Sequence, residues 1–484
     1  MRRPWWIRAT AVVSGVAVVA VGLPAGASAA AGEYGFVVNA KPGAGAFGAA
    51  RAAVVAAGGV VKMEYPQIGV LVVTAADPGV GVVVRRSGAV SSAGKTRTVP
   101  VAPAGPTMPA VVSPPVAGKP GGAEPLESLQ WGLRAIGADK AHQKTVGRRD
   151  VLVSVLDNSV DDTHPDLAPN FEKSASANCV GGRPDPTEGS WRPTTLTSSH
   201  GTSVAGIAVA ARNGVGTAGV APGVGLAAVK VASGGLYTTE SVVCGLVWSA
   251  EHGADVVNMS FYVDPWYFNC LDDPDQRALA ESVQRATKYA ERKGTVLVAA
   301  GMNSGHDLGA PTLVDESSPG DGTPVTRTVD RSRCISIPAE LPGVVTVAAT
   351  GAHNLKSSYS NYGLGVIDIA APGGEQEDYQ PPTAPAVSNQ IIAPVPGGTW
   401  EYVLGTSMAT PMVAGVAALI RSVHPKASPA EVRARLFAST SKLACPPNYD
   451  FDNDGTTDAT CSGSTAYNSF YGHGLLNAQA AVKR

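Results

Sequence analysis

The sequence is short of charge. Charged residues make up 16% of its 484 residues, and the formal net charge is only −2, whereas about 25% is usual in soluble proteins. Such a chain offers no strong field for nucleic acid or for an anionic membrane surface, so neither is an expected partner. The many alanine and glycine residues indicate a compact main domain and argue against disorder there.

Long apolar runs are also lacking, apart from one near the N-terminus. Arginines precede an apolar run from Ala9 to Leu23, and the small residues Ala27-Ser28-Ala29 follow it. This order is typical of a secretory signal peptide, which we place at residues 1–30. The run is too short and too rich in glycine and alanine to predict a retained membrane span. We therefore expect a secreted, extracellular monomer without a stable membrane anchor.

The six cysteines include no Cys-X-X-Cys pair, which argues against a zinc site. In an exported chain, cysteines are expected to form disulfides. Six cysteines can pair in fifteen ways. Of these we expect neighbour pairing, which joins Cys179 to Cys244, Cys270 to Cys334 and Cys445 to Cys461.

Composition divides the rest of the chain into three parts. Residues 31–93 contain short strand-like runs and an alanine-rich helix, at 34–38, 44–57, 60–64 and 68–73, which predict a small α+β unit. Residues 94–124 are rich in proline, alanine and glycine without periodicity, so they are interpreted as a linker. Residues 125–484 are numerous enough for one extensive core.

Strand-like apolar runs alternate with helical stretches in this last part. The strands are expected at 151–156, 226–231, 256–259, 296–299, 344–348 and 366–369, and the clearest amphipathic helix at Leu279–Arg292. Alternation of this kind predicts an α/β fold of three layers, a parallel sheet with helices on both faces. Functional side chains are then expected at strand ends and helix starts.

A serine stands at the start of one such helix. Gly405-Thr406-Ser407 precedes a buried, apolar stretch that contains Pro411. A proline is best tolerated in the first turn of a helix, so the helix is expected to start near Ser407. The N–H groups and positive end of a helix can hold an oxyanion next to such a serine.

Two other positions could complete a nucleophilic site. Asp157 ends the first apolar strand, and His200 precedes the small-residue helix that Gly201 opens. A nucleophilic serine needs a base to take its proton and a carboxylate to fix the tautomer of that base. The chain order Asp157, His200, Ser407 is one of the known orders of such a triad.

With these blocks, the chain from Leu129 to Ala481 resembles the subtilisin-like serine endopeptidases, or subtilases. The resemblance implies that Asp157 orients His200, that His200 is the base and Ser407 the nucleophile, and that Asn303 donates to the oxyanion. It implies protein or peptide substrates and no cofactor for the chemistry. Residues 31–93 resemble the propeptide that subtilases use as an intramolecular chaperone and inhibitor, which would make the chain a zymogen. An ordinary small N-terminal domain is the alternative.

The resemblance also places the substrate cleft and shows where this chain departs from the family. The expected cleft residues are Ser260, Phe261, Tyr262, Ala300 and Met302. Glycine is usual at the positions of Tyr262 and Met302, so a pocket that favours small residues before the scissile bond is expected. Thr-Gly usually follows the aspartate, where this chain has Asn158-Ser159, and small polar residues there should be tolerated.

An aspartate-rich segment near the C-terminus is open to two interpretations. Asp450, Asp452 and Asp454 alternate before Gly455, and Asp458 follows. This spacing can wrap oxygens around a structural Ca²⁺, although the glutamate that completes an EF-hand is missing. A solvated acidic turn between Cys445 and Cys461 is the alternative.

The function expected from the sequence is thus a secreted serine endopeptidase that works through an acyl-enzyme. Two other functions stay open. An amine could resolve the same acyl-enzyme, as in a peptide ligase or cyclase. The fold could also serve a non-catalytic binding protein.

Overall fold

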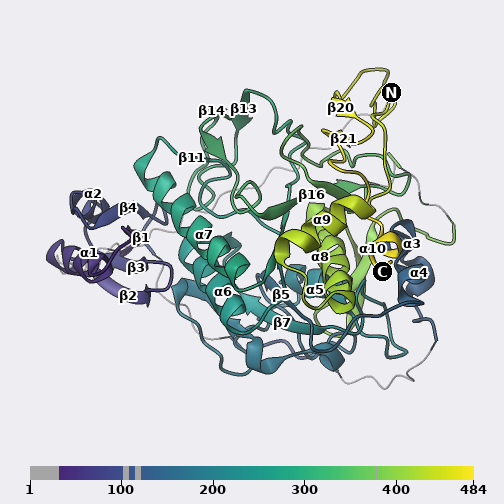
Figure 1. The fold of residues 1–484 in the computed structure, drawn as a ribbon, viewed down its shortest axis with the longest axis horizontal. Coiled ribbons are helices and arrows are strands. Elements are labelled where there is room, and N and C mark those ends of the chain that lie inside the picture. The colour runs from purple at the N-terminus through teal and green to yellow at the C-terminus, as the bar shows by residue number, and fades with distance from the viewer. Residues whose placement is uncertain are drawn as a thin grey trace, which may run out of the picture.

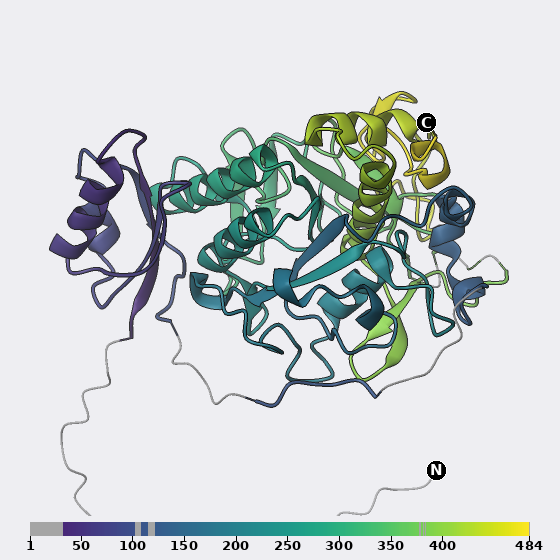
Figure 2. The same cartoon turned by 60° about the horizontal axis from the view of Figure 1, so that its bottom comes forward.

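The computed structural model describes residues 32–101, 108–114, 122–376, 379–380, 382 and 384–483. The expected signal peptide lies outside the described residues. A small N-terminal unit sits at one end of the molecule, beside helix α7 (Pro274–Arg292) of the main domain (Figures 1 and 2).

The N-terminal unit is the expected α+β unit. It contains β1 (Tyr34–Ala40), α1 (Ala46–Ala56), β2 (Val60–Tyr65), β3 (Val70–Ala75), α2 (Val80–Val84) and β4 (Val90–Lys95). The strands form an antiparallel sheet in the order β2-β3-β1-β4. Because β4 pairs with β1 as far as Lys95, the boundary expected at residue 93 is wrong. The sequence assigns Gly94 and Lys95 to the linker, but their pairing with β1 makes them part of β4.

The main domain is built on seven parallel strands. Their order across the sheet is β17-β16-β12-β10-β5-β7-β6. Their bounds are β5 (Leu152–Asp157), β6 (Ala177–Asn178), β7 (Gly225–Lys230), β10 (Val256–Met259), β12 (Val296–Ala300), β16 (Val344–Thr350) and β17 (Ile369–Pro372). Every neighbouring pair is parallel, so the predicted fold class is confirmed.

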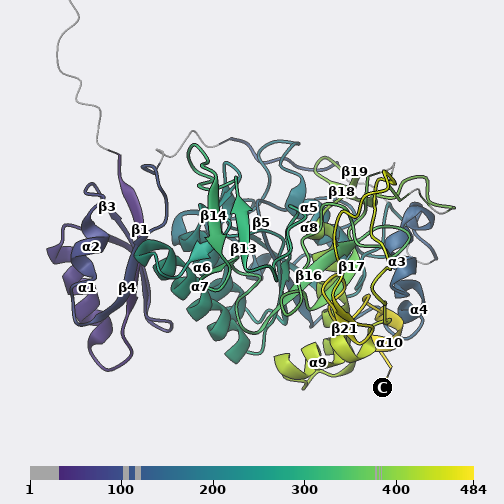
Figure 3. The same ribbon diagram turned by 90° about the horizontal axis from the view of Figure 1, so that it is seen from above.

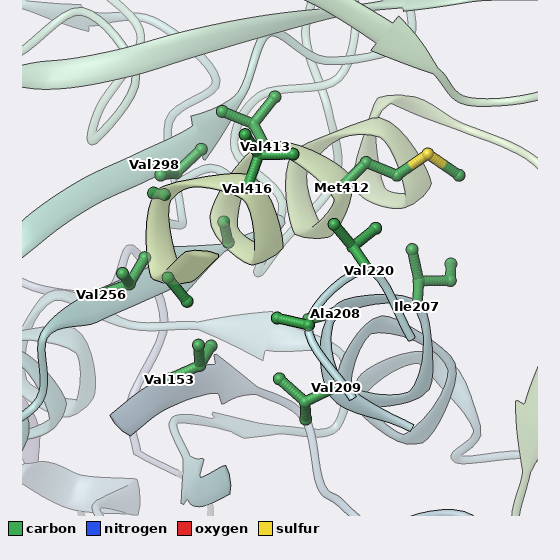
Figure 4. Close-up of a cluster of buried hydrophobic side chains, with 14 of the residues drawn as sticks. Val153, Ile207, Ala208, Val209, Val220, Val256, Val298, Met412, Val413 and Val416 are labelled. Carbon is green, nitrogen blue, oxygen red and sulfur yellow. The ribbon is translucent and has the colours of Figure 1, made fainter. Parts of the chain in front are cut away.

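Helices cover both faces of this sheet (Figure 3). Helices α5 (His200–Val209) and α8 (Thr406–Val423) pack on one face, where Val153 and Val155 of β5 join their core. Figure 4 shows this core, in which valines of the sheet meet residues of both helices. Helices α6 (Thr239–Glu251) and α7 pack on the other face of the sheet. Leu156 points to that face, because it alternates along β5 with Val153 and Val155. This alternation is what a strand buried on both faces requires.

The centre of the sheet is a topological switch point. β5 lies between β7 and β10. The chain runs first from β5 to β6 and β7 on one side and then crosses to β10 on the other. A crevice opens at the carboxyl ends of the strands at such a point, and ligands of open α/β sheets bind there. Asp157 is the last residue of β5.

The remaining elements are short or peripheral. The helices are α3 (Trp131–Ala135), α4 (Ala138–His142), α9 (Pro429–Ser439) and α10 (Ala478–Ala481), with short 3-10 helices at Glu127–Leu129, Ala168–Asn170, Lys173–Ala175 and Val180–Gly182. Two-stranded sheets pair β8 (Ala232–Ser233) with β9 (Leu236–Tyr237), β11 (Asn269–Cys270) with β15 (Cys334–Ile335), β13 (Thr312–Asp315) with β14 (Arg327–Asp330), β18 (Ile391–Val395) with β19 (Thr399–Val403), and β20 (Gly463–Ser464) with β21 (Tyr467–Asn468).

Helix α8 is the one helix of the described residues that is long and apolar enough to cross a membrane. It is 94% buried inside the domain, so its composition is that of a core helix. The last expected strand, 366–369, is displaced in the structure: Val366 and Ile367 pack into a separate cluster, and pairing with β16 begins only at Ile369.

Candidate active site

The expected triad residues come from the carboxyl edge of the sheet and from the helices beside it. Asp157 ends β5 and is fully buried. His200 is the first residue of α5, and Ser407 is the second residue of α8. Helices α5 and α8 pack against each other (Figure 4). The N-terminus of α5 meets the end of β5, and the N-terminus of α8 meets Ser260, just after the neighbouring strand β10.

Asp157 and His200 form a hydrogen-bonded pair. Nδ1 of His200 lies 2.8 Å from Oδ1 of Asp157. Burial lowers the pKa of His200, but the attraction of the carboxylate and its hydrogen bond outweigh this effect, so the pKa is raised. The pair therefore has the arrangement in which a carboxylate fixes a histidine tautomer and stabilises the imidazolium.

The Asn158-Ser159 turn holds this pair in place. Oδ1 of Asn158 accepts from the N–H of Gly201 (3.1 Å), and the hydroxyl of Ser159 donates to the carbonyl of Ser198 (3.1 Å). A Cβ atom at Gly201 would lie 2.2 Å from the carbonyl oxygen of Ser159, so only glycine fits after the histidine. The departure from the family pattern thus fastens β5 to the start of α5.

Ser407 is tied to the end of β10. Its hydroxyl donates to the carbonyl of Ser260 (3.1 Å), and the hydroxyl of Ser260 donates to the carbonyl of Ser407 (3.0 Å). The expectation that Pro411 lies in the first helical turn is wrong, because α8 begins at Thr406 and Pro411 lies in the second turn. Proline cannot donate to the carbonyl four residues earlier, and Ser260 bonds that freed carbonyl instead.

Asn303 lies next to the start of α8. Its Oδ1 accepts from the backbone N–H and from the hydroxyl of Thr406, both at 2.9 Å. The side chain is exposed, and with Oδ1 engaged, its amide group Nδ2 is the part left to donate into the crevice. The N–H of Ser407, in the first turn of α8, has no acceptor within the helix. Two donors are thus available for one oxyanion.

Met302 has a backbone conformation that favours glycine. Its φ is 77°, in the left-handed region where a side chain costs about 1–2 kcal/mol. The N–H of Met302 donates to the hydroxyl of Thr406 (3.1 Å), which also bonds Asn303. The conformation usual for glycine is therefore kept at this position.

The expected cleft residues lie at two strand ends. Ser260, Phe261 and Tyr262 follow β10, whereas Ala300 ends β12 and Met302 follows it. Tyr262 and Met302 pack against the same cluster of buried residues, which includes Tyr267. The centroids of the Tyr262 and Tyr267 rings are 5.0 Å apart.

The structure also brings to the site a residue that the sequence did not indicate. The hydroxyl of Tyr237 lies 3.1 Å from Oδ1 of Asp157. The only local signal is the Gly234-Gly235 pair just before it, which is typical of a tight hairpin turn and says nothing of Asp157.

The six cysteines form three disulfides in the structure. They join Cys179 to Cys244, Cys270 to Cys334 and Cys445 to Cys461. The expected neighbour pairing is confirmed.

Three of the four aspartates in the C-terminal segment lie together. Carboxylate oxygens of Asp450, Asp452 and Asp454 lie within 4.8 Å of one another. Asp458 instead accepts from the N–H of Phe451 (2.7 Å). Gly455 has a φ of 89°, so it makes the sharp turn that was expected of it.

Known proteins are similar to this chain over most of its length. The model of the subtilase family matches residues 148–474. Subtilisin Savinase from Lederbergia lenta is 32% identical over 358 residues, which cover 74% of this chain and 100% of that protein. Subtilisin E from Bacillus subtilis (strain 168) is 32% identical over 363 residues, which cover 74% of this chain and 73% of that protein.

Two solved structures extend the likeness to the N-terminal unit. The epidermin leader peptide processing serine protease from Staphylococcus aureus is 22% identical, with a TM-score of 0.68, and the match covers 93% of this chain and 98% of that one. Fervidolysin from Fervidobacterium pennivorans is 22% identical, with a TM-score of 0.59, over 93% of this chain and 61% of that one. At these identities, the likeness shows the fold alone.

Proposed function

The chain belongs to the subtilase family and is a serine endopeptidase, and on this premise we propose that it is exported as a zymogen and cuts its substrates with Asp157, His200 and Ser407. The observation that carries the proposal is the 2.8 Å hydrogen bond between Asp157 and His200. It forms at the carboxyl edge of the sheet, and Ser407 lies in the first turn of α8, whose start is bonded by Asn303.

In the proposed reaction, the Oγ of Ser407 attacks the peptide carbonyl while neutral His200 takes the proton of the Ser407 hydroxyl. Asp157 stabilises the imidazolium that forms. The oxyanion receives hydrogen bonds from Nδ2 of Asn303 and from the N–H of Ser407. His200 then protonates the leaving amine, and water releases the acyl-enzyme. The Ser407 hydroxyl must first leave the Ser260 carbonyl, a rearrangement that substrate binding commonly brings about.

A labelling experiment tests this function and separates it from the two alternatives. We expect a fluorophosphonate to label the mature enzyme at Ser407 and a model peptide to give two hydrolysed fragments. A folded protein that takes no label would be a binding protein. Fragments that are joined to an added amine in preference to water would identify a ligase.

Export is supported by two features. Three disulfides persist only in an oxidising compartment, and the first 30 residues have the pattern of a signal peptide. We propose that the mature enzyme acts outside the cell on proteins or peptides, as a monomer.

We further propose that the N-terminal unit is an inhibitory propeptide. It binds the main domain through α7: the side-chain amide of Asn39 donates to the carbonyl of Ala278 (3.0 Å) and accepts from the hydroxyl of Ser282 (3.0 Å). Arg97 pairs with Glu240 of α6 (3.1 Å), and the N–H of Thr98 donates to Asp321 (2.6 Å). The chain is thus held as far as Thr98, inside the segment expected to be a linker, so cleavage should fall between Val99 and Leu129.

A close contact at Gly94 allows a sharp test of this docking. A Cβ atom there would lie 2.4 Å from the carbonyl oxygen of Asp275 on α7. We expect the isolated segment 32–101 to inhibit the mature enzyme in trans, and Gly94→Ala to raise its inhibition constant about 10–100-fold, because overpacking costs about 1–3 kcal/mol. Gly88→Ala is the matched control, since nothing lies within 4 Å of its added atom. A mature N-terminus near Ala31 with full activity would contradict the proposal.

The substrate pocket should be narrow. Tyr262 and Met302 follow two neighbouring strand ends at positions where the family usually has glycine, and we propose that they occupy volume that a large side chain before the scissile bond would need. We expect Ala to be preferred over Phe at that position, and Tyr262→Gly to raise kcat/KM for Phe substrates about tenfold relative to Ala substrates. Equal cleavage of both substrates by the unchanged enzyme would show that the pocket is open.

We propose that the Asp450–Asp454 loop binds a structural calcium ion. Three carboxylates at alternate positions supply the oxygen ligands that Ca²⁺ prefers. Calcium should raise the melting temperature by several degrees, because it binds the folded loop alone, and Asp452→Asn should abolish this rise. Asp139→Asn, an exposed carboxylate on α4, is the control. A melting temperature that does not respond to calcium or EDTA would show that the loop is a solvated acidic turn that binds no calcium.

A further inference from the structure

Tyr237 connects the wall of the cleft to the triad carboxylate. Its hydroxyl donates to Oδ1 of Asp157 (3.1 Å), and its ring stacks on Phe261, with centroids 4.3 Å apart and planes at 11°. We propose that Tyr237 is a positioning residue whose hydroxyl orients Asp157 and sets how strongly that carboxylate attracts the proton of His200. The proposal rests on the triad function proposed above.

The backbone around Tyr237 is fixed before any substrate arrives. β8 and β9 form a hairpin in which Ala232 faces Tyr237. The two turn residues, Gly234 and Gly235, have φ values of 60° and 83°, as a type I′ turn requires. Asp264 then holds Tyr237 from the other side: its carboxylate accepts from the Tyr237 N–H (2.7 Å), and its own N–H donates to the Tyr237 carbonyl (2.9 Å).

The carboxylate of Asp157 depends on few donors. Oδ1 accepts from His200 (2.8 Å), from the backbone N–H of Asn158 (2.7 Å) and from Tyr237 (3.1 Å). Oδ2 is buried and has no hydrogen-bond partner among the described residues. The tyrosine hydroxyl is therefore one of three groups that stabilise a buried negative charge, and in such surroundings each donor has a large effect.

The direction of that effect follows from electrostatics. A donor that stabilises the Asp157 carboxylate weakens its pull on the imidazolium of His200, so loss of the hydroxyl should raise the pKa of His200. Because His200 must be neutral to act as the base, activity should then appear at higher pH.

The other charged groups nearby are few. Asp264 faces Tyr237, and burial raises the pKa of Asp264 to about 6. Arg97 and Asp321 face Asp264 in turn, while Asp157 is the charge that acts on His200. Since Asp264 is present in every variant compared, the difference between pH profiles reports the change at Tyr237.

The test is Tyr237→Phe, which keeps the ring on Phe261 and removes the hydroxyl. We expect kcat per labelled active site to fall about 10-fold, the factor that matches one hydrogen bond to a charged group. KM should stay unchanged, because the hydroxyl acts on the buried Asp157. The acid limb of the kcat/KM profile should move up by about 0.5–1 pH unit.

The matched control is Tyr289→Phe on α7. The Tyr289 hydroxyl also donates to a carboxylate, that of Glu251 (3.2 Å), but this pair lies on the surface. The control variant should leave both kcat and the acid limb as they are. An active Tyr237→Phe enzyme with the wild-type kcat and acid limb would overturn the inference while the triad function stands. A wild-type protein that neither takes the fluorophosphonate nor cleaves peptides would instead remove the proposed function, and the inference with it.

A second measurement covers the case in which Tyr237→Phe does not fold. Enzyme with 3-fluorotyrosine at position 237 carries a more acidic hydroxyl there, which is a stronger donor to Asp157. Its acid limb should move to lower pH, opposite to the shift in Tyr237→Phe. An acid limb that stays in place would overturn the inference.

Discussion

Replacing Ser407 with alanine should lower turnover about 10⁶-fold and leave the full-length precursor uncleaved. The magnitude is the one measured in subtilisin, from which it is taken. In the proposed reaction only the Oγ of Ser407 can form the acyl-enzyme. In the alanine variant, His200 therefore has no hydroxyl to activate. The measurement is turnover of a peptide substrate per mole of protein, together with the size of the purified chain.

Ser422 provides a matched control on the same helix. Both serines are 7% exposed, and the hydroxyl of Ser422 bonds the carbonyl of Ala418 within α8 (2.8 Å). The same hydroxyl accepts from the N–H of Arg148 (3.1 Å). Ser422→Ala should process and cleave normally, with a stability loss of about 1–3 kcal/mol for the two lost hydrogen bonds. Normal processing of a purified Ser407→Ala precursor would show that another residue or another protease does the cutting.

Replacing Asn303 with alanine should lower kcat about 10²–10³-fold with little change in KM. The figure is again that of subtilisin, where one oxyanion donor was removed. The amide acts on charge that is present mainly in the transition state, so binding of the substrate should hardly change. Single-turnover and steady-state kinetics on the same peptide measure the two effects separately.

Asn303 also bonds the start of α8, and a second variant separates the two roles. Asn303→Asp keeps an oxygen for the N–H and hydroxyl of Thr406 but replaces the donating amide with a negative oxygen. If the amide serves the oxyanion, this variant should be at least as impaired as Asn303→Ala. Activity restored in Asn303→Asp would mean that the loss came from the helix start. Nearly full activity in both would show that Asn303 does not hold the oxyanion.

Several features of the fold could be predicted because burial alone decides them. The run Val256–Met259 is a strand with the expected bounds, since a short, continuous apolar segment between helices is typical of a parallel strand buried on both faces. Asp157 and His200 could be paired from the sequence because each lies within an extended block of the family pattern.

Other features depend on contacts that no local pattern records. Pro411 lies in the second turn of α8, where the hydroxyl of Ser260, far away in the chain, bonds the carbonyl that proline leaves free. The strand expected at 366–369 was displaced because apolar residues also serve a second cluster. The contact between Tyr237 and Asp157 joins a glycine hairpin to a strand end, and neither segment carries a sign of the other.

The purely parallel sheet has a consequence for how the chain reaches its native state. Val153 pairs with Leu226 on one side and with Val256 on the other, so the central strand must close loops of about seventy and a hundred residues. Such high contact order makes folding slow. The strand partners of the N-terminal unit are nearer in sequence, from Tyr65 with Val70 to Phe36 with Lys95, and this unit holds α7. After the proposed removal of this unit, we expect an unfolded molecule to refold slowly. The working life of the mature enzyme is then set by how rarely it unfolds.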